Sequence, residues 1–495
     1  MTEAAIQIEE LAKIIADAQN KRQPSGHENS TLRFPRLESL SIQPAEKRIG
    51  LPEGMTEAKG SKILAQAAEA LEQEIQRVRQ FSAREEDLYV AVHEVCLQMF
   101  AHTGKGNKIS GGFFSPDMPP RIRDVVVGLD RHGNKKVKTV AVSGFQLENL
   151  EATIDFGNWY HEEYGYCGMI AVSTKKRHER EIDVFLDAVE EYINRHSIYK
   201  GEVVEFKKRK HPREEETRYE LTHMRTDPDR NIVYTKDVET DLNFALFGKI
   251  KHSQTFKSIG QDSTFRTLLY GPFGTGKTEC AQMAAEVAVA NGWTAVFFTP
   301  GSDDTLDDFE AAINVASMYG PSLLIVEDVD KFYGRDLNEN QKSHVSNFIQ
   351  GAMAKTSEVS LLMTTNHLES FDARMTRRLT PVKVDVLDRE ATERLFNQLL
   401  GKELADDVDF DRIYEVVSGS NPSFIRGTFD DARKNSVVTN NGEVGHKLTT
   451  DDLLSAAKKN KDHYDIHMSQ LSKPLAERYI DAMREAEQLK AQLFN

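Results

Sequence analysis

Residues 267–278 read Thr-Leu-Leu-Tyr-Gly-Pro-Phe-Gly-Thr-Gly-Lys-Thr, an apolar run that passes directly into a glycine-rich loop. The loop matches the pattern GxxxxGK[ST] over its full length. Its glycines allow backbone N–H groups to turn inward around a phosphate chain, and the N-terminus of a following helix adds partial positive charge. A helical pattern over 279–290 supplies that helix. The stretch therefore predicts a parallel α/β sheet of the P-loop NTPase type.

Each residue type in this loop has a predicted role. Lys277 is expected to reach the β- and γ-phosphates of a nucleotide, and the Thr278 hydroxyl is expected to ligate Mg²⁺. The other predicted binding residues surround the phosphates: Gly271, Pro272, Phe273, Gly274, Thr275, Gly276 and Glu279. The expected cofactors are ATP and Mg²⁺.

A second apolar run, Ser322–Val326, ends in Glu327-Asp328-Val329-Asp330. A continuous apolar run is typical of a buried parallel strand, and acids at its carboxyl end would lie beside the phosphate loop. Glu327 and Asp328 are therefore predicted as metal-binding and catalytic residues, one holding Mg²⁺ and the other polarising the attacking water. The alternative is an acidic turn on the surface.

A third apolar run, over 361–365, ends at Asn366, which is positioned to orient the hydrolytic water. Arg374, Arg377 and Arg378 follow within twelve residues. Arginine suits the charge of a phosphate transition state because it is always ionised and binds oxygens with two donors. An arginine supplied by a neighbouring subunit requires an oligomer.

Together these residues resemble the AAA+ ATPase superfamily, in particular the group that includes the valosin-containing-protein and spastin/katanin branches. The resemblance covers residues of about 230–435. It implies that residues 271–278 are the Walker A motif, that Glu327 and Asp328 are the Walker B acids, and that Asn366 is sensor 1.

The resemblance also implies a quaternary arrangement. ATP would bind between subunits of a homo-oligomeric ring, a hexamer, with Arg377 or Arg378 as the arginine finger of the next subunit. Arg426, in a helical lid, would be sensor 2 and contact the nucleotide. Hydrolysis would rotate the lid against the sheet domain and remodel a macromolecular client, a chaperone-like activity on protein.

Three departures from the family pattern change these expectations. The usual Asp-Glu order of Walker B is inverted, and the shorter Asp328 side chain predicts slow turnover. The stretch 300–306 lacks the aromatic–hydrophobic pair with which relatives thread protein, so threading is not predicted. The spacing around Arg377 and Arg378 is shorter than usual, which leaves open which arginine is the finger.

The remaining sequence predicts a small α+β domain before the nucleotide-binding domain. A helical pattern runs over 62–78, and strands over 124–129 and 137–145 flank a turn, followed by strands over 152–156, 168–172 and 202–206 and a helix over 179–195. The predicted division is 1–60 helix and flexible tether, 61–205 client or adaptor domain, 206–235 linker, 236–388 nucleotide-binding domain, and 389–495 helical lid and C-terminal helix.

The composition argues against several functional classes of protein. The 495 residues carry 63 Lys and Arg against 78 Asp and Glu, a net charge of −15, which argues against a general nucleic-acid coat. No apolar run approaches the roughly 20 residues of a membrane span, the N-terminus lacks a secretory pattern, and the three cysteines are far apart. A cytoplasmic protein without a membrane partner is expected. A nucleic-acid motor using the basic stretch 207–210, and a slow-turnover assembly switch, remain alternatives.

Three further features have competing interpretations. A metal site at His161 lacks the spacing of known motifs, so a polar loop is favoured. Cys280 follows the phosphate loop, where redox sensing competes with burial in the helix–sheet interface. The aromatic cluster Trp159, Tyr160, Tyr164 and Tyr166 is a client-binding face or, by default, a core.

Overall fold

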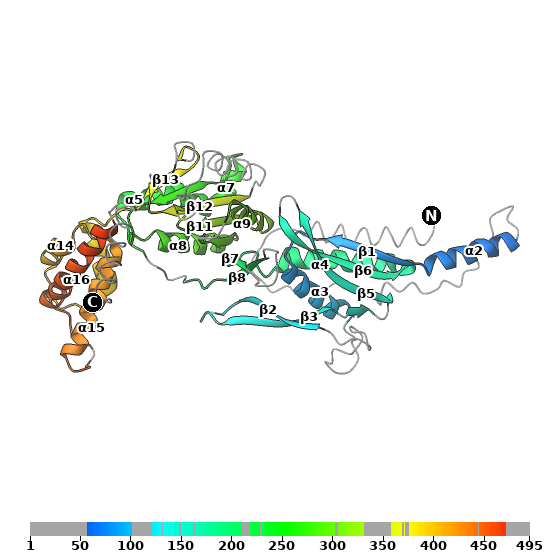
Figure 1. Cartoon of the computed structure of the whole chain (residues 1–495), viewed down its shortest axis with the longest axis horizontal. Helices are drawn as coiled ribbons and strands as arrows, with labels where there is room; N and C mark the ends of the chain where they lie inside the picture. The colour runs from blue at the N-terminus through cyan, green and yellow to red at the C-terminus, as the bar shows by residue number, and fades with distance from the viewer. Residues whose placement is uncertain are drawn as a thin grey trace, which may run out of the picture.

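The computed structural model describes residues 57–100, 121–130, 132–143, 145–147, 150–161, 164–209, 218–227, 230, 232–301, 305–330, 358–368, 371, 376–443 and 445–471. In Figure 1 these form an α+β N-terminal half, a central sheet with its helices, and a helical lid at the opposite end. The predicted N-terminal helix, the predicted tether up to residue 56, Arg374 and the helix predicted beyond residue 471 lie outside the described residues, whereas residues 57–60 of that tether begin a helix.

The central sheet has seven strands in the order β13-β9-β12-β11-β10-β7-β8. All neighbouring pairs are parallel except β7 and β8, which are antiparallel. The strands are β9 (Arg266–Tyr270), β10 (Thr294–Phe298), β11 (Ser322–Val326), β12 (Val359–Thr365), β13 (Thr380–Lys383), β7 (Val203–Arg209) and β8 (Arg218–His223). This mostly parallel sheet confirms the predicted fold class.

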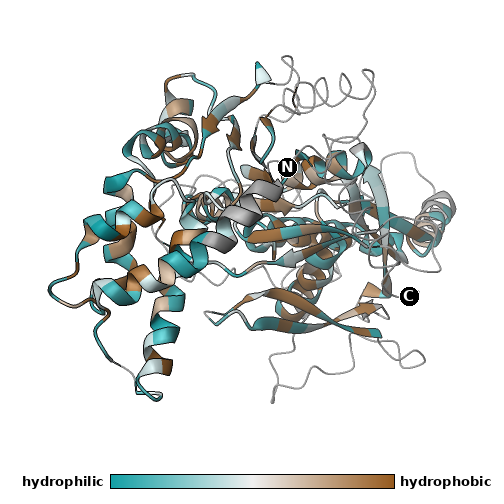
Figure 2. Cartoon of the chain, turned by 60° about the vertical axis from the view of Figure 1, so that its left-hand side comes forward, coloured by the Kyte–Doolittle hydropathy of each residue, from teal (hydrophilic) through white to brown (hydrophobic). Residues whose placement is uncertain are grey.

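Helices cover both faces of this sheet, which explains why its inner strands β10, β11 and β12 are buried along their whole length. The helix α8 (Lys277–Ala290) packs with one apolar core, and α9 (Leu306–Met318) packs with the other. The segment that enters the sheet contains α5 (Lys236–Leu242), the π-helical η5 (Asn243–Phe247), α6 (Gly248–Lys251) and α7 (Ser253–Ser258). Figure 2 shows hydrophobic residues concentrated in the strands of the sheet.

The strands β7 and β8 correct the predicted domain boundary. Residues 206–235 were expected to be a linker because of their mixed charge, but β7 pairs with β10 and β8 pairs with β7. The charges are satisfied locally: Lys207 lies 2.7 Å from Glu205, and Lys208 lies 2.8 Å from Asp308 at the start of α9. The hairpin therefore extends the central sheet instead of separating two domains.

The N-terminal half contains a sheet of order β1-β6-β5-β4 and a separate ribbon of β2 and β3. The strands are β1 (Glu74–Gln80), β2 (Arg121–Leu129), β3 (Lys135–Ser143), β4 (Phe145–Leu147), β5 (Ala152–His161) and β6 (Gly165–Lys175). The helices are α2 (Glu57–Leu71), α3 (Glu85–Phe100), the short η4 (Lys176–His178) and α4 (Glu179–His196). The β2–β3 ribbon confirms the predicted hairpin, and β5, β6 and α4 confirm the elements predicted near them.

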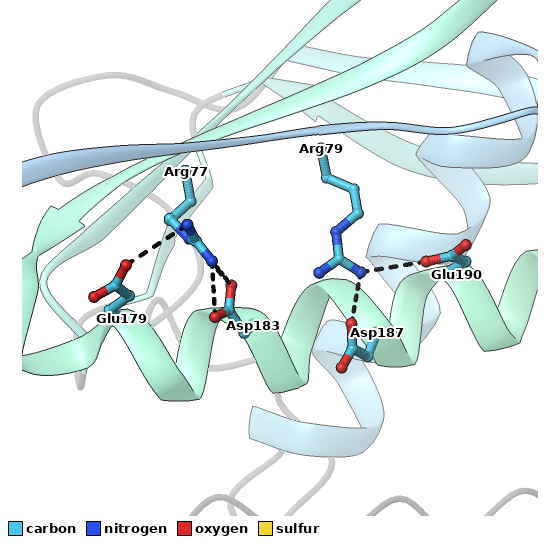
Figure 3. Close-up of polar contacts among 6 residues, drawn as sticks. All are labelled: Arg77, Arg79, Glu179, Asp183, Asp187 and Glu190. Atoms are coloured by element: carbon cyan, nitrogen blue, oxygen red, sulfur yellow. Dashed lines mark hydrogen bonds and ion pairs between the residues drawn. The ribbon is translucent and has the colours of Figure 1, made fainter.

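The predicted helix over 62–78 is wrong in its second half, because Ile75 and Val78 lie in β1. The strand pairs with β6 over its whole length, and two of its arginines also face acidic residues of α4 (Figure 3). Arg77 binds Asp183 at 2.7 and 2.8 Å. Arg79 binds Asp187 at 2.5 Å and Glu190 at 3.2 Å. The strand is selected by a partner that lies more than one hundred residues away in sequence.

The two halves share one apolar core. Val90 of α3, Val140 of β3, Val204 of β7 and Leu324 of β11 belong to the same buried cluster. Asp87 of α3 reinforces this joint, since its carboxylate accepts the hydroxyl of Tyr319 at the end of α9 at 2.9 Å. The N-terminal half is therefore packed against the central sheet along a continuous interior.

The lid has its own core. Its helices are α13 (Arg389–Leu400), α14 (Phe410–Val417), α15 (Pro422–Thr439) and α16 (Thr450–Leu471). Three of them begin at side-chain caps: Asp388, Asp409 and Asn421 each accept a backbone N–H of the first turn. In this separate core, Phe396 and Phe429 pack edge to face.

Candidate functional site

The glycine-rich loop connects β9 to α8 and has the backbone that its glycines allow. Gly271, Gly274 and Gly276 have φ values of +150°, +74° and +94°. These conformations strain any residue with a side chain. A Cβ atom on Gly271 would also lie 2.0 Å from the carbonyl oxygen of Val384. The loop is thus held closely against the chain that leaves β13.

Lys277 begins α8 and points back into the loop. Its side chain is only 6% exposed, and its Nζ donates to the carbonyl oxygens of Gly271 at 2.8 Å and Pro272 at 2.7 Å. Burial lowers the pKa of Lys277 to about 8, although the carboxylates of Asp328 and Asp330 favour its charged form. At neutral pH the ammonium group is therefore mostly charged and can attract phosphate.

The two acids after β11 are held by the neighbouring strands. The N–H of Glu327 donates to the carbonyl oxygen of Phe298 at 3.1 Å. The N–H of Asp328 donates to the hydroxyl of Thr364 in β12 at 3.0 Å. Asp328 has a φ of +47°, which is unusual outside glycine and is typical of strained functional positions. The backbone at Asp328 is thus anchored to β12.

Asn366 lies at the end of β12, as its place after an apolar run predicts. Its Nδ2 donates to Oδ1 of Asp328 at 3.3 Å. Its backbone N–H donates to Asp330, whose carboxylate also accepts the Thr365 hydroxyl at 2.8 Å. The structure therefore brings Asp328 and Asn366 together, and Lys277 lies close enough for the charge of the Asp328 carboxylate to act on it.

Asp330 also belongs to this site, although it was not predicted from the sequence. It stabilises the end of β12, from which Asn366 projects, and its charge favours the ammonium form of Lys277. The available signal was its position two residues after Asp328 in the acidic run. Two acids spaced in this way at a strand end can both turn toward the neighbouring strand.

The residues assigned to Mg²⁺ offer oxygen donors. Mg²⁺ in nucleotide sites is typically held by one or two protein oxygens together with phosphates. Thr278, in the first turn of α8, supplies a hydroxyl, and Glu327 and Asp328 supply carboxylates at the end of β11. This donor set is of the kind that Mg²⁺ prefers.

The predicted arginines occupy two different places. Arg377 and Arg378 lie in the turn before β13, with Arg377 exposed and Arg378 half-buried. Arg426 lies on α15 and is exposed. The lid contacts the loop instead through the start of α15: Nδ2 of Asn421 donates to the Phe273 carbonyl oxygen at 2.9 Å, and the Ser423 N–H donates to the Gly274 carbonyl oxygen at 3.1 Å.

The structure also places the cysteine, the histidine and the aromatic cluster whose roles the sequence left open. Cys280 is fully buried in α8, and burial raises its pKa to about 12, so a reactive thiolate is suppressed. The ring of His161 stacks on Tyr164 at 4.5 Å. Tyr160 and Tyr166 form an edge-to-face pair and are each 59% exposed, so the expectation that these two belong to a core is wrong.

Comparison with known proteins finds a family match in the central part of the chain. Residues 267–385 match the family described as ATPase family associated with various cellular activities (AAA). The chain is 24% identical to the ATP-dependent zinc metalloprotease FtsH 2 of Phytoplasma mali, over 46% of this chain and 36% of that protein. It is 22% identical to the proteasome-activating nucleotidase of Saccharolobus solfataricus, over 42% and 56% of the two chains.

A longer alignment joins the chain to the cell division cycle protein 48 homolog of Archaeoglobus fulgidus, with 22% identity over 69% of this chain and 49% of that protein. The aligned parts span from about a third to little more than half of these relatives. Across the helices that the structure describes, none combines the length and apolar character that a membrane crossing needs.

Proposed function

Because residues 267–385 form an AAA ATPase domain, we propose that this chain hydrolyses ATP with Mg²⁺ and uses the hydrolysis to remodel or unfold a protein client. The observation that carries the proposal is the meeting of three groups at the carboxyl ends of β9, β11 and β12. The Asn366 amide donates to the Asp328 carboxylate, and the charge of that carboxylate acts on Lys277. A phosphate-binding cation beside a hydrogen-bonded carboxylate is the arrangement that phosphoryl transfer to water requires.

In this proposal each residue has one role. Lys277 binds the β- and γ-phosphates, while Thr278 and Glu327 hold Mg²⁺. Asp328 orients and polarises the attacking water, and Asn366 keeps the Asp328 carboxylate in place. An aspartate is one methylene shorter than the usual glutamate, so turnover is expected to be slow.

The active assembly in this proposal is a homo-oligomeric ring, a hexamer. Arg377 and Arg378 support it, because they lie in the turn before β13 and Arg377 is exposed, as a residue that acts on a neighbouring subunit must be. The relatives include a protease and a proteasome-activating nucleotidase, which favours a protein client. The N-terminal half would bind that client or its adaptor, and the exposed pair Tyr160 and Tyr166 is its candidate contact.

The test is the steady-state ATPase rate of the wild type and three variants. Lys277→Ala is expected to abolish nucleotide binding, and Asp328→Asn is expected to keep binding but to lose hydrolysis by about 100-fold or more. Glu415→Gln removes an exposed carboxylate from α14 and serves as the control for loss of charge. Parental rates in both Lys277→Ala and Asp328→Asn would refute the site.

The same assay separates the classes of client. Unfolded protein, single-stranded DNA and duplex DNA are added in parallel to the wild type. Stimulation by unfolded protein supports the remodelling activity. Stimulation by DNA alone would overturn it in favour of a nucleic-acid motor, and tight ATP binding without turnover under all conditions would indicate a switch.

A further inference from the structure

The lid holds two consecutive carbonyl groups of the phosphate loop. The Asn421 side-chain amide donates to the carbonyl oxygen of Phe273 at 2.9 Å. The N–H of Ser423 donates to the carbonyl oxygen of Gly274 at 3.1 Å. Both donors belong to the start of α15, so one rigid element fixes two neighbouring peptide groups of the loop.

The orientation of these peptide groups determines where their N–H groups point. The peptide that carries the Phe273 carbonyl also carries the Gly274 N–H, and the next peptide pairs the Gly274 carbonyl with the Thr275 N–H. In a trans peptide the C=O and N–H point in opposite directions. Among the described residues the cis peptide is at Gly320-Pro321, so both loop peptides are trans. With their carbonyls turned to the lid, the N–H groups of Gly274 and Thr275 point away from it.

We propose that Asn421 is a positioning residue that orients the phosphate-binding N–H groups of Gly274 and Thr275. This inference rests on the proposed function, because it assumes that the loop binds a nucleotide. It assigns to Asn421, rather than to the exposed Arg426, the link between the lid and the nucleotide site. Asn421 acts through the loop backbone and need not touch the nucleotide.

Asn421 does more than begin a helix. Its Oδ1 accepts the N–H of Phe424 at 2.8 Å, which is the usual hydrogen bond of an N-cap. Its Nδ2 makes a second hydrogen bond, to the phosphate loop. Serine and aspartate cap helices about as well as asparagine, but neither can accept from the helix and donate an amide N–H to the loop at once. The loop contact is therefore a separate property of the amide.

The position of Asn421 is fixed from the other side by α16. The residue is 7% exposed, and its backbone N–H donates to the hydroxyl of Tyr464 at 3.2 Å. Lys461, one turn earlier, donates to the Ser420 hydroxyl at 3.1 Å and lies over the Tyr464 ring. Because Asn421 is already fixed by these contacts, its side chain loses little conformational entropy when it binds the loop.

The loop in turn fits the lid closely. A Cβ atom on Gly274 would lie 2.8 Å from Nδ2 of Asn421 and 3.0 Å from Cβ of Ser423. If the lid position favours nucleotide binding, bound nucleotide must favour that lid position by the same factor. The contact is thus expected to couple occupancy of the loop to docking of the lid.

The experiment compares two Asn421 variants that keep the cap of α15 with a control variant that loses the cap of another lid helix. Asn421→Ser and Asn421→Asp retain capping but lack the amide donor. Asp409→Ala is the matched control, since it removes the cap of α14 in the same lid without a contact to the loop. Affinity is measured with a fluorescent mant-ADP in the presence of Mg²⁺, and lid docking by hydrogen exchange of α15 with and without MgADP.

Asn421→Ser is expected to raise the Kd for mant-ADP about three- to tenfold, the effect of one lost hydrogen bond, and Asn421→Asp to raise it further by repulsion. Both should reduce the protection of α15 that MgADP confers. Asp409→Ala should leave the Kd unchanged. If the wild type binds mant-ADP and both Asn421 variants bind it within twofold of the wild type, Asn421 is only a cap and the inference is wrong. A wild type that binds no nucleotide would overturn the proposed function as well.

Discussion

The buried carboxylate of Asp87 provides a prediction about the joint between the N-terminal half and the central sheet. Asp87 is 2% exposed and accepts the N–H of Ile198 at 2.7 Å, the hydroxyl of Tyr319 at 2.9 Å and the hydroxyl of Ser197 at 3.0 Å. Burial raises the pKa of Asp87 to about 6, although these three hydrogen bonds favour the ionised form. We consider the substitution Asp87→Asn, which preserves the shape of the side chain and removes its ionisable carboxyl group.

The sign and the size of the effect follow from the pKa. A carboxyl whose pKa is higher in the folded protein than in the unfolded chain destabilises the fold when it is ionised. A rise from 3.8 to about 6 corresponds to about 3 kcal/mol at pH 7.5. As the pH falls through 6, Asp87 takes up a proton and the cost declines, by about half at pH 5. Asparagine has no such dependence.

We therefore expect the wild type to gain about 1.5 kcal/mol of unfolding free energy relative to Asp87→Asn between pH 7.5 and pH 5. Urea unfolding of both proteins at several pH values measures this difference, and a constant m-value shows that the unfolded states are comparable. Asp155→Asn, at an exposed position of β5, controls for removal of one carboxyl group. A difference that stays flat with pH, or that moves in the opposite direction, would refute the reasoning.

Two further predictions use the loop lysine and the tryptophans. Burial lowers the pKa of Lys277 to about 8, so the affinity for mant-ADP should fall roughly tenfold between pH 7 and pH 9 as the ammonium loses its proton. Fluorescence titrations at several pH values measure this change, and an affinity that stays constant over that range would contradict it. The chain has 2 tryptophans, Trp159 in β5 and Trp293 before β10. Because the two halves share a core, fluorescence of Trp159→Phe and Trp293→Phe should report coincident urea transitions, whereas two separate midpoints would contradict the shared core.

The parts of the fold that could be predicted are those whose signal is local. The strands β9, β11 and β12 are mostly apolar because helices cover both faces of the sheet; the glycine-rich loop follows β9, and polar residues follow β11 and β12. The carboxyl ends of parallel strands meet at one edge, so the proximity of Asp328 and Asn366 could be anticipated without coordinates. The glycine pattern at 271–276 required positive φ values, which the structure has.

The parts that could not be predicted depend on partners far away in sequence. Ile75 and Val78 are three residues apart, a spacing that a helix pattern accommodates, and the strand forms through partners distant in sequence, β6 and the acids of α4. The charges of β7 indicate a solvated linker unless Asp308 is known to lie beside Lys208. The contact of Asn421 with Phe273 depends on how the lid docks, which no local pattern specifies.

The distribution of apolar cores indicates which joint of the molecule can move. Along the entering segment, Val233 packs in the lid core and Tyr234 in the core of the sheet. Along the leaving segment, Val384 packs in the core of the sheet and Leu387 in the lid core. The chain therefore passes between the lid and the sheet at two places, and each passage takes only a few residues.

Polar contacts bridge the lid and the sheet, among them Asn421 with Phe273 and Arg394 with Glu239 at 2.8 Å. Polar contacts exchange with water at little net cost, whereas separating the N-terminal half from the sheet would expose a shared apolar core. A change in the phosphate loop is therefore expected to move the lid while the N-terminal half and the sheet remain one body. Rotation at the joint between the lid and the sheet would then move the sheet and the N-terminal half together relative to the lid. A client bound by the N-terminal half would move with them.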